Sequence, residues 1–276
     1  MPELIGTHYC QNGVLKSTDF FNPSFLQNKR IIYEVIRIEE GIGLFWEDHI
    51  SRMFESLKLI GFETDLNTME LNSCFLKVIE SNKRYSGNIK IMVCLNYEGQ
   101  YDIFAYFIPH FYPSQTMYDN GIDTSLLHAK RQAPNIKALS PLREIAEKYI
   151  REKRIFEALL VNEQNNITEG SKSNIFFIQG ILLVTPPADQ VLKGITRQKI
   201  IDICNMLNYK VIEKIVCCSD LNKFDAAFIT GTSPKVLPIR NIDEQAYAVQ
   251  NQVINQISGM YDNMIRQYIR NAKLNS

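Results

Sequence analysis

The chain has 276 residues, which suits two compact lobes better than a single core. Its 30 acidic and 30 basic residues cancel, so no overall charge would attract nucleic acid or an anionic membrane. The first residues lack the basic and apolar segments of a signal peptide, and the longest apolar runs have only the length of a strand. We therefore expect a soluble, cytoplasmic protein that binds neither nucleic acid nor membrane.

Cysteine and histidine residues are few and scattered along the chain. None of the six cysteines has the spacing of a zinc knuckle or a redox pair, and there are only four histidines. We expect reduced, mostly buried thiols and no metal site.

The first lobe is predicted to begin with short β-type segments and to combine strands with two helices. A β-branched run predicts a strand at 31–38, and apolar residues at helical spacing predict a helix at 47–59. In that helix His49 and Arg52 are three residues apart, so both project from one side. The remaining predicted elements are a helix at 69–82 and strands at 88–95 and 101–108, joined by a turn at 96–99.

Turn residues replace periodic ones at 111–121, which predicts a linker there. We accordingly expect an N-terminal lobe at 1–118 and a C-terminal lobe at 119–276. The C-terminal lobe is predicted to contain strands at 123–129, 157–161 and 225–230, a hairpin turning at 179–180, and helices at 142–153, 196–207 and 248–271. Ser140 and Pro141 are expected to cap and begin the first of these helices.

Three features of the chain could bind a phosphate. Gly194-Ile195-Thr196 stands where a helix begins, so its backbone N–H groups and the helix dipole would face an anion. Gly231-Thr232 offers amides and a hydroxyl at the end of a strand, and Arg52 offers a guanidinium. Each also has an ordinary interpretation, as a plain turn or a solvated arginine.

Two further residues could carry covalent or acid–base chemistry. Lys137 lies in a loop of small and apolar residues, where a lysine can form a Schiff base. Glu169 lies in a polar, glycine-containing turn at the edge of the hairpin. Either could be a simple surface residue. Together with the phosphate-binding candidates, they match what pyridoxal 5'-phosphate requires of a protein.

A longer pattern is similar to the signature of the class IV aminotransferases, the fold type IV pyridoxal-phosphate enzymes. It reads Glu169-x-Ser171-x-x-Asn174-Ile175-Phe176, six residues, Leu183-x-Thr185, six residues, Leu192-x-Gly194-Ile195-x-Arg197. Other blocks of the chain also resemble the family, namely Tyr33-Glu34-Val35-x-Arg37, His49-x-x-Arg52, Arg131-x-Ala133-Pro134-Asn135-Ile136-Lys137 and Phe228-Ile229-Thr230-Gly231-Thr232-Ser233.

The resemblance implies a role for each matching residue. Lys137 would carry the cofactor and act as the catalytic base and acid, and Glu169 would hold the ring nitrogen protonated. The other cofactor-binding residues it implies are Arg52, Arg131, Ser171, Asn174, Gly194, Ile195, Thr196, Gly231 and Thr232. Tyr33 would stand on the substrate side. The arginine that traps the substrate carboxylate in several members has no clear equivalent here, and Lys90 is the candidate replacement.

The resemblance also implies an α/β (α+β) fold, with a small α/β sandwich lobe, a larger α/β barrel-like lobe that carries the lysine, the cofactor between them, and a homodimer. The implied activity is amino transfer between a branched-chain or D-amino acid and a 2-oxo acid. One alternative is a 4-amino-4-deoxychorismate lyase, which releases pyruvate and 4-aminobenzoate. Another is a catalytically silent binding protein. The lyase stays open because it would use the same Lys137 and Glu169. The silent protein stays open because the chain lacks the family's usual glycine-containing run at 25–32 and the carboxylate-binding arginine. Leu142, where branched-chain enzymes usually have tyrosine, leaves the substrate open.

Overall fold

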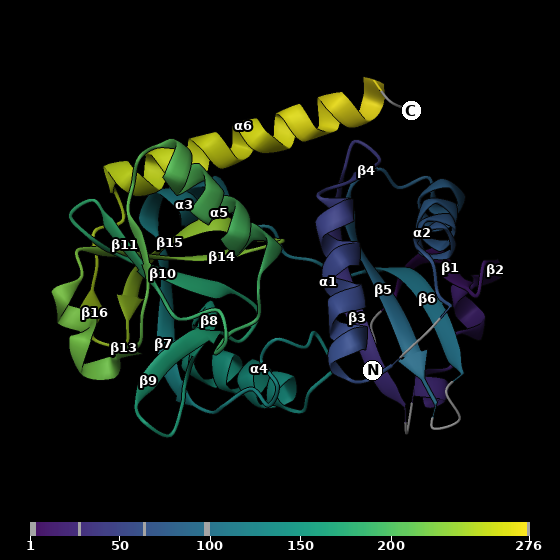
Figure 1. Cartoon of the computed structure of the whole chain (residues 1–276), viewed down its shortest axis with the longest axis horizontal. Coiled ribbons are helices and arrows are strands. Elements are labelled where there is room, and N and C mark those ends of the chain that lie inside the picture. The colour runs from purple at the N-terminus through teal and green to yellow at the C-terminus, as the bar shows by residue number, and fades with distance from the viewer. Residues whose placement is uncertain (1–3, 27–28, 63–64, 97–99, 275–276) are drawn as a thin grey trace. The chain divides into compact units, whose positions relative to one another are not determined.

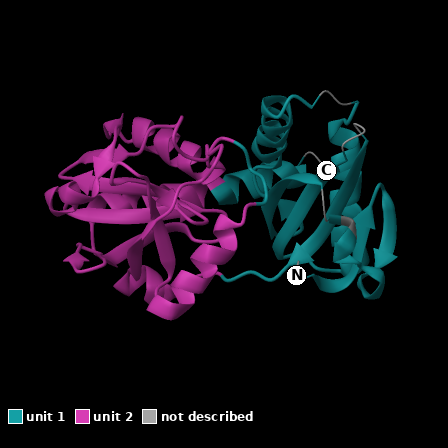
Figure 2. Ribbon diagram, turned by 90° about the horizontal axis from the view of Figure 1, so that it is seen from below, with its two compact units in different colours: residues 1–111, 136–139, 265–276 teal, residues 112–135, 140–264 magenta. Residues whose placement is uncertain are grey.

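The computed structural model describes residues 4–26, 29–62, 65–96 and 100–274. The chain forms two compact units (Figure 2). Unit 1 comprises residues 1–111, 136–139 and 265–276, and unit 2 comprises residues 112–135 and 140–264. The short segment 136–139, which contains Lys137, thus groups with unit 1. The expected lobes at 1–118 and 119–276 stay a prediction.

Unit 1 is an antiparallel six-stranded sheet in the order β2-β1-β6-β5-β3-β4 (Figure 1). Its strands are β1 (Ile5–Gln11), β2 (Val14–Ser17), β3 (Arg30–Glu39), β4 (Ile42–Gly43), β5 (Gly87–Leu95) and β6 (Tyr101–Ile108). Its helices are α1 (Trp46–Leu59) and α2 (Thr68–Asn82), with the short 3-10 turns η1 (Thr18–Phe20) and η2 (Pro23–Leu26).

Helices α1 and α2 pack on the sheet through apolar stripes. Ile50, Met53 and Leu57 recur at helical spacing along α1 and are buried in the same core as the α2 residues Leu71 and Phe75. Asn67 caps α2 because its side chain accepts a hydrogen bond from the Glu70 N–H at 3.1 Å. Burial of one helix face against the sheet therefore fixes where α1 presents its remaining side chains.

Unit 2 is built on a mixed ten-stranded sheet, in the order β12-β11-β10-β14-β15-β7-β8-β9-β13 with β16 paired to β15. Its strands are β7 (Ile122–His128), β8 (Glu157–Val161), β9 (Asn166–Gly170), β10 (Asn174–Gln179), β11 (Leu182–Thr185), β12 (Val211–Glu213), β13 (Val216–Cys217), β14 (Ala226–Gly231), β15 (Lys235–Ile242) and β16 (Gln245–Ala246). Its helices are α3 (Gln115–Asn120), α4 (Leu142–Lys153), α5 (Ile195–Met206) and η3 (Cys218–Lys223), and α6 (Gln252–Leu274) starts in unit 2 and ends in unit 1.

Several sequence predictions need correction. The predicted linker at 111–121 contains helix α3, and Glu169 lies in strand β9 and not in a turn. The final helix begins at Gln252, four residues later than predicted from 248. Pro141 is the N-cap of α4, and Ser140 Oγ accepts a hydrogen bond from the Leu142 N–H at 3.3 Å. Strands β12, β13, β15 and β16 were not predicted. The turn at 96–99 and the run at 25–32 lie partly outside the described residues.

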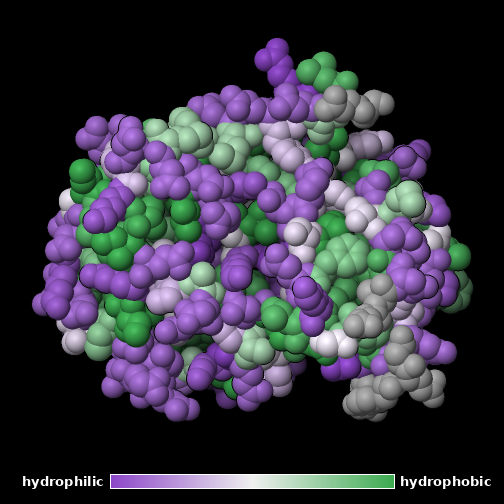
Figure 3. All heavy atoms as spheres, viewed as in Figure 1, coloured by the Kyte–Doolittle hydropathy of each residue, from purple (hydrophilic) through white to green (hydrophobic). Residues whose placement is uncertain are grey.

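Hydrophilic side chains cover most of the face in Figure 3, and hydrophobic ones form small separate patches. Within the described ranges, no helix has the length and apolar character needed to cross a membrane.

Candidate active site

The predicted site residues belong to both units, so each group is described within its own unit. Unit 1 contains Tyr33, Arg52, Lys90 and Lys137. Unit 2 contains Arg131, Glu169, Ser171, Asn174, Gly194, Ile195, Thr196, Gly231 and Thr232.

Lys137 is fixed to strand β3 through its backbone. The Tyr33 N–H donates to the Lys137 carbonyl at 3.0 Å, and Ala138 forms an isolated antiparallel bridge with Ile32. The Lys137 N–H also donates to Ser56 Oγ on α1 at 3.4 Å. Because β3 and α1 both bind the Lys137 backbone, the Cα from which its half-buried side chain extends is held in place.

The Tyr33 ring meets two lysine ammonium groups. Lys90 Nζ lies 4.5 Å and Lys137 Nζ 5.2 Å from the ring centroid, both within the range of a cation–π contact. Lys90 is only 6% exposed and stands on β5, next to β3. Two cations around one aromatic ring make this part of unit 1 suited to an anionic group. The sequence-predicted substrate residues Tyr33 and Lys90 are therefore neighbours of the predicted catalytic lysine.

Arg52 and His49 share one buried carboxylate, that of Glu34 on β3. Arg52 Nε donates to Glu34 Oε1 at 2.8 Å and Arg52 Nη2 to Glu34 Oε2 at 2.5 Å, a bidentate pair. His49 Nδ1 lies 2.7 Å from Glu34 Oε2. Burial opposes ionisation of Glu34, but Arg52 and His49 outweigh it and lower the pKa of Glu34 to about 2. Burial lowers the pKa of His49, although Glu34 opposes this. The two hydrogen bonds from Arg52 to Glu34 hold the guanidinium group of Arg52 in one orientation.

Glu169 is the acidic centre of the group in unit 2. Its side chain is 2% exposed. Oε1 accepts a hydrogen bond from Arg131 Nε at 2.7 Å, and Oε2 accepts one from the Leu192 N–H at 3.1 Å. Arg131 Nη2 also donates to the Ser171 carbonyl at 3.3 Å. The structure thus pairs two predicted cofactor residues, the half-buried Arg131 and the buried Glu169, as an ion pair.

Asn174 joins the two predicted phosphate loops. Its amide donates to the Leu192 carbonyl at 2.8 Å, just before α5, and its backbone is the register partner of Thr230 at the end of β14. A Cβ on Gly194 would lie 2.0 Å from Asn174 Oδ1, so a larger residue there would displace the Asn174 side chain. The start of α5 and the end of β14 therefore lie at one edge of the sheet.

The turn between β9 and β10 is organised by Glu157, a buried residue of β8. Ser171 Oγ donates to Glu157 Oε1 at 2.6 Å, and Ser173 Oγ donates to Glu157 Oε2 at 3.0 Å. Burial raises the pKa of Glu157, although these two hydroxyl groups oppose the rise. Ser171 thus supports, through Glu157, the turn that follows Glu169.

Two observations in unit 2 fit a bound phosphate. Helix α5 begins with Gly194 as N-cap and without a side-chain cap, so the Ile195 and Thr196 amides face outward with the positive end of the dipole behind them. In addition, Thr230 Oγ1 is buried and makes no hydrogen bond to any part of the chain that the structure describes. It precedes Gly231, the last residue of β14, and Thr232, the first residue after that strand. An unused hydrogen-bonding group beside uncapped amides suits an oxyanion.

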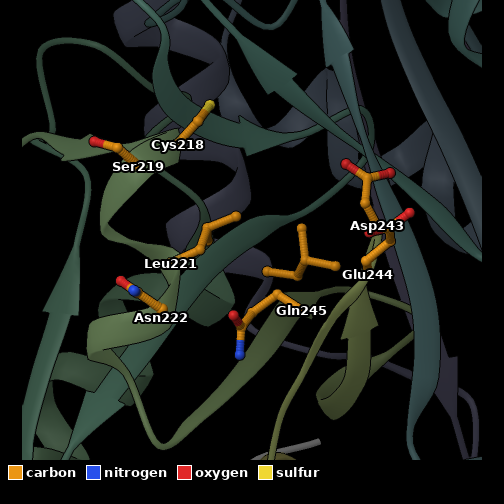
Figure 4. Close-up of a pocket in the computed structure, with 8 residues that line it drawn as sticks. Cys218, Ser219, Leu221, Asn222, Asp243, Glu244 and Gln245 are labelled. Atoms are coloured by element: carbon orange, nitrogen blue, oxygen red, sulfur yellow. The ribbon is translucent and has the colours of Figure 1, made fainter.

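Other features do not provide an alternative centre. A cavity of about 340 Å³ in unit 2, between η3 and the β15–β16 turn, contains none of the predicted site residues (Figure 4). It is lined by Cys218, Ser219, Leu221, Asn222, Ile242, Asp243, Glu244 and Gln245. Among the described side chains, no group of three or more His, Cys, Asp or Glu could hold a metal ion.

The chain belongs to the class IV aminotransferases, whose family model matches residues 31–242. It is therefore an enzyme of that family. The D-alanine aminotransferase of Bacillus licheniformis is 32% identical over 228 residues, which cover 78% of this chain and 79% of that protein. A putative branched-chain-amino-acid aminotransferase of Methanocaldococcus jannaschii is 26% identical over 243 residues, covering 82% and 83% of the two chains.

The solved structures agree on the fold. The PLP-form of a branched-chain amino acid aminotransferase from Thermobaculum terrenum matches with a TM-score of 0.79 at 21% identity, covering 96% of this chain and 95% of that one. The predicted family and the α/β fold of type IV are thus confirmed.

Three residues with an evident role in these groups are absent from the predicted site: Glu34, His49 and Glu157. Glu34 and His49 lie in the blocks of sequence that resemble the family. Glu34 is an acidic residue within a largely apolar predicted strand, and this pattern could have indicated a functional role. Glu157 precedes the buried run Ala158–Val161 and gives the same signal. The sequence does not show which side chains Glu34 and Glu157 contact, because these contacts join residues 14 to 18 positions apart that lie on different elements.

Proposed function

We propose that this protein is a pyridoxal-phosphate-dependent aminotransferase that moves an amino group between an amino acid of the branched-chain or D-amino acid type and a 2-oxo acid. The observation that carries the proposal is the position of Lys137, fixed to β3 with its Nζ 5.2 Å from the Tyr33 ring centroid. Membership of the class IV aminotransferases and the names of the relatives support it.

Bound pyridoxal phosphate would supply an electron-accepting ring that stabilises negative charge at the substrate Cα. We propose that Lys137 attaches the cofactor through Nζ and moves the proton at Cα as general base and acid. Glu169 would hold a proton on the ring nitrogen, and its carboxylate already makes an ion pair with Arg131 at 2.7 Å. Arg131 would approach the ring hydroxyl, as the resemblance to the family implies.

The phosphate would be bound by Arg52, by the uncapped amides of Ile195 and Thr196, and by Gly231 and Thr232. Ser171 and Asn174 would act by supporting these loops, since their side chains bond to Glu157 and to the Leu192 carbonyl. Glu34 would orient Arg52 through the bidentate pair.

The substrate carboxylate would be bound by Lys90 beside Tyr33. The buried ammonium of Lys90 lies 4.5 Å from the Tyr33 ring centroid, in the same unit as Lys137. A lysine here replaces the arginine of several family members with a compact charge, so carboxylate recognition would be monodentate. A homodimer and a cytoplasmic location remain part of this proposal.

A half-reaction screen tests the proposal. Protein loaded with pyridoxal phosphate is mixed with single L- and D-amino acids, and loss of the visible absorbance of the lysine-bound cofactor is followed. An aminotransferase loses this band with a subset of amino acids and regains it with 2-oxoglutarate or pyruvate. Release of pyruvate and 4-aminobenzoate from aminodeoxychorismate would instead establish the lyase. Cofactor binding without any half-reaction would indicate the silent binding protein.

A further inference from the structure

Cys10 and Cys74 bring two thiol groups together in the core of unit 1, and neither has been assigned a role above. Cys10 lies on β1 and Cys74 on α2, and their sulfur atoms are 3.0 Å apart. Both side chains are fully buried, and both are free thiols. Since a disulfide bond measures about 2.05 Å, the sulfurs need to approach by only about 1 Å.

The elements that carry the two thiols are held together independently of them. Eight residues along α2 from Cys74, Asn82 Oδ1 accepts the Thr7 and His8 N–H groups at 2.7 and 3.1 Å, and Asn82 Nδ2 donates to the His8 carbonyl at 3.0 Å. Figure 1 shows α2 beside β1. The close approach of the sulfurs is thus maintained by two packed elements and not by mobile side chains.

We propose that Cys10 and Cys74 are a reversible redox modification site, at which a peroxide drives a disulfide that links strand β1 to helix α2. A backbone bend brings the loop after β1 onto Cys74, because the Gly13 N–H donates to Cys74 Sγ at 3.2 Å. Lys77 Nζ donates to the Gly13 carbonyl at 2.7 Å, which places a positive charge on the same loop.

These contacts select Cys74 as the attacking sulfur. The hydrogen bond from Cys10, with help from Gly13 and Lys77, lowers the pKa of Cys74, although burial opposes this. The same hydrogen bond and burial raise the pKa of Cys10. The thiolate is the nucleophile in such reactions, so Cys74 reacts first and Cys10 resolves.

The loop that contacts the buried Cys74 thiol lines a cavity, although neither sulfur atom does. Gly13 and Ser73, the residue before Cys74, line a cavity of about 570 Å³ on unit 1. Hydrogen peroxide fits such a space easily.

The chemistry balances with one hydrogen peroxide. The Cys74 thiol releases its proton and attacks one peroxide oxygen as the thiolate. The O–O bond breaks, Cys74 becomes a sulfenic acid, and the leaving hydroxide takes up the released proton and becomes water. The Cys10 sulfur then attacks Cys74, the S–O bond breaks, and the Cys10 proton leaves with the departing oxygen as water. Two thiols and one peroxide become one disulfide and two waters. A dithiol reverses the change and is itself oxidised to a disulfide.

Non-reducing peptide mapping tests the proposal on the full-length protein. The protein is treated with hydrogen peroxide, alkylated, digested and analysed by mass spectrometry, with the adjacent Cys217 and Cys218 replaced (C217S/C218S) in a parallel sample to remove competing thiols. A peptide joining Cys10 to Cys74 is expected in both samples, and dithiothreitol should release it. The oxidised protein should melt roughly 5–10 °C higher than the reduced one.

Cys74→Ser should abolish both the link and the melting shift. Cys94→Ser, which removes a buried thiol from the other core of the same sheet, should keep both. The proposal is overturned if Cys10 and Cys74 remain alkylated after peroxide, if either links to another cysteine, or if the link forms without a melting shift. The mapping of the unsubstituted protein decides the case even if Cys74→Ser does not fold.

Discussion

Gly194 and Asn174 are packed so closely that an added Cβ at position 194 would lie 2.0 Å from Asn174 Oδ1. This contact ties the first turn of α5 to strand β10, because the same Asn174 side chain donates to the Leu192 carbonyl. The position of the proposed phosphate-binding amides therefore depends on close packing between Gly194 and Asn174.

Gly194→Ala should lower the stability of the fold by about 1–3 kcal/mol, since the methyl group overpacks a buried contact. Because the α5 amides move with it, the affinity for pyridoxal phosphate should fall at least roughly tenfold, the equivalent of about 1.4 kcal/mol. Denaturant unfolding and cofactor titration measure the two effects. Gly259→Ala, in α6 and with open space at its Cβ, is the control and should leave affinity unchanged.

Glu34→Gln should cost about 3 kcal/mol of stability, because it leaves the Arg52 guanidinium buried without its charge partner. Cofactor affinity should fall as well, since Arg52 loses its bidentate anchor. Urea unfolding at neutral pH measures the loss. Glu55→Gln, an exposed residue on the same α1 helix, should stay close to the unsubstituted protein.

The effect of Glu34 should also depend on pH in a defined direction. Its pKa falls from 4.5 to about 2 in the folded protein. A carboxylate with a lowered folded-state pKa stabilises the fold above its unfolded pKa, and this stabilisation is lost as the pH falls toward the folded value. The stability gap between the unsubstituted protein and Glu34→Gln should therefore narrow as the pH falls from 4.5 to about 2. A gap that stayed constant across this range would contradict the assignment.

Lys90→Met should raise KM for the amino acid about 10–100-fold with a smaller change in kcat, because a charge contact to the substrate carboxylate is removed from ground and transition states alike. Lys90→Arg should restore part of the affinity. Steady-state kinetics with the best substrate of the screen measure both. Lys58→Met, an exposed site on α1, is the control. If kcat fell and KM did not change, Lys90 would have another role.

Glu169→Gln should reduce kcat by on the order of 100-fold or more, because a neutral amide no longer holds a proton on the ring nitrogen. Cofactor binding should weaken less, since the phosphate contacts remain. Single-turnover kinetics with the loaded protein separate the two effects. Glu163→Gln, an exposed acid in the same unit, should leave both unchanged.

Local patterns in the sequence predicted much of the fold. Strand β6 and helix α4 have the predicted bounds, and α1 and β3 begin and end within a residue of them, since each has a clear apolar period and a turn or cap at its ends. The β12 and β16 strands are only three and two residues long, too short for a period to appear. Glu169 was wrongly predicted to lie in a turn because the residues around it are mostly polar. It belongs to strand β9, which begins at Asn166 and ends at Gly170.

The candidate site was predictable as a set of residues but not as a set of contacts. The signature identified Glu169 and Gly194, yet the attachment of Lys137 to β3 joins residues more than a hundred positions apart. Glu34 and Arg52 are 18 positions apart and Cys10 and Cys74 are 64 positions apart, and each of these pairs also joins separate elements of the chain. Such pairings arise from tertiary packing, which no spacing along a single sequence reports.

The most direct test of the central claim is to locate the lysine that bonds to pyridoxal phosphate. The loaded protein is reduced with borohydride, digested and mapped by mass spectrometry, together with Lys137→Ala and with Lys130→Ala as an exposed neighbour in the same loop. We expect the phosphopyridoxyl group on Lys137, retained in Lys130→Ala and absent from Lys137→Ala, which should also lose the visible band and all amino transfer. Labelling of Lys90 or another lysine in the unsubstituted protein, or an unchanged band in Lys137→Ala, would contradict the account.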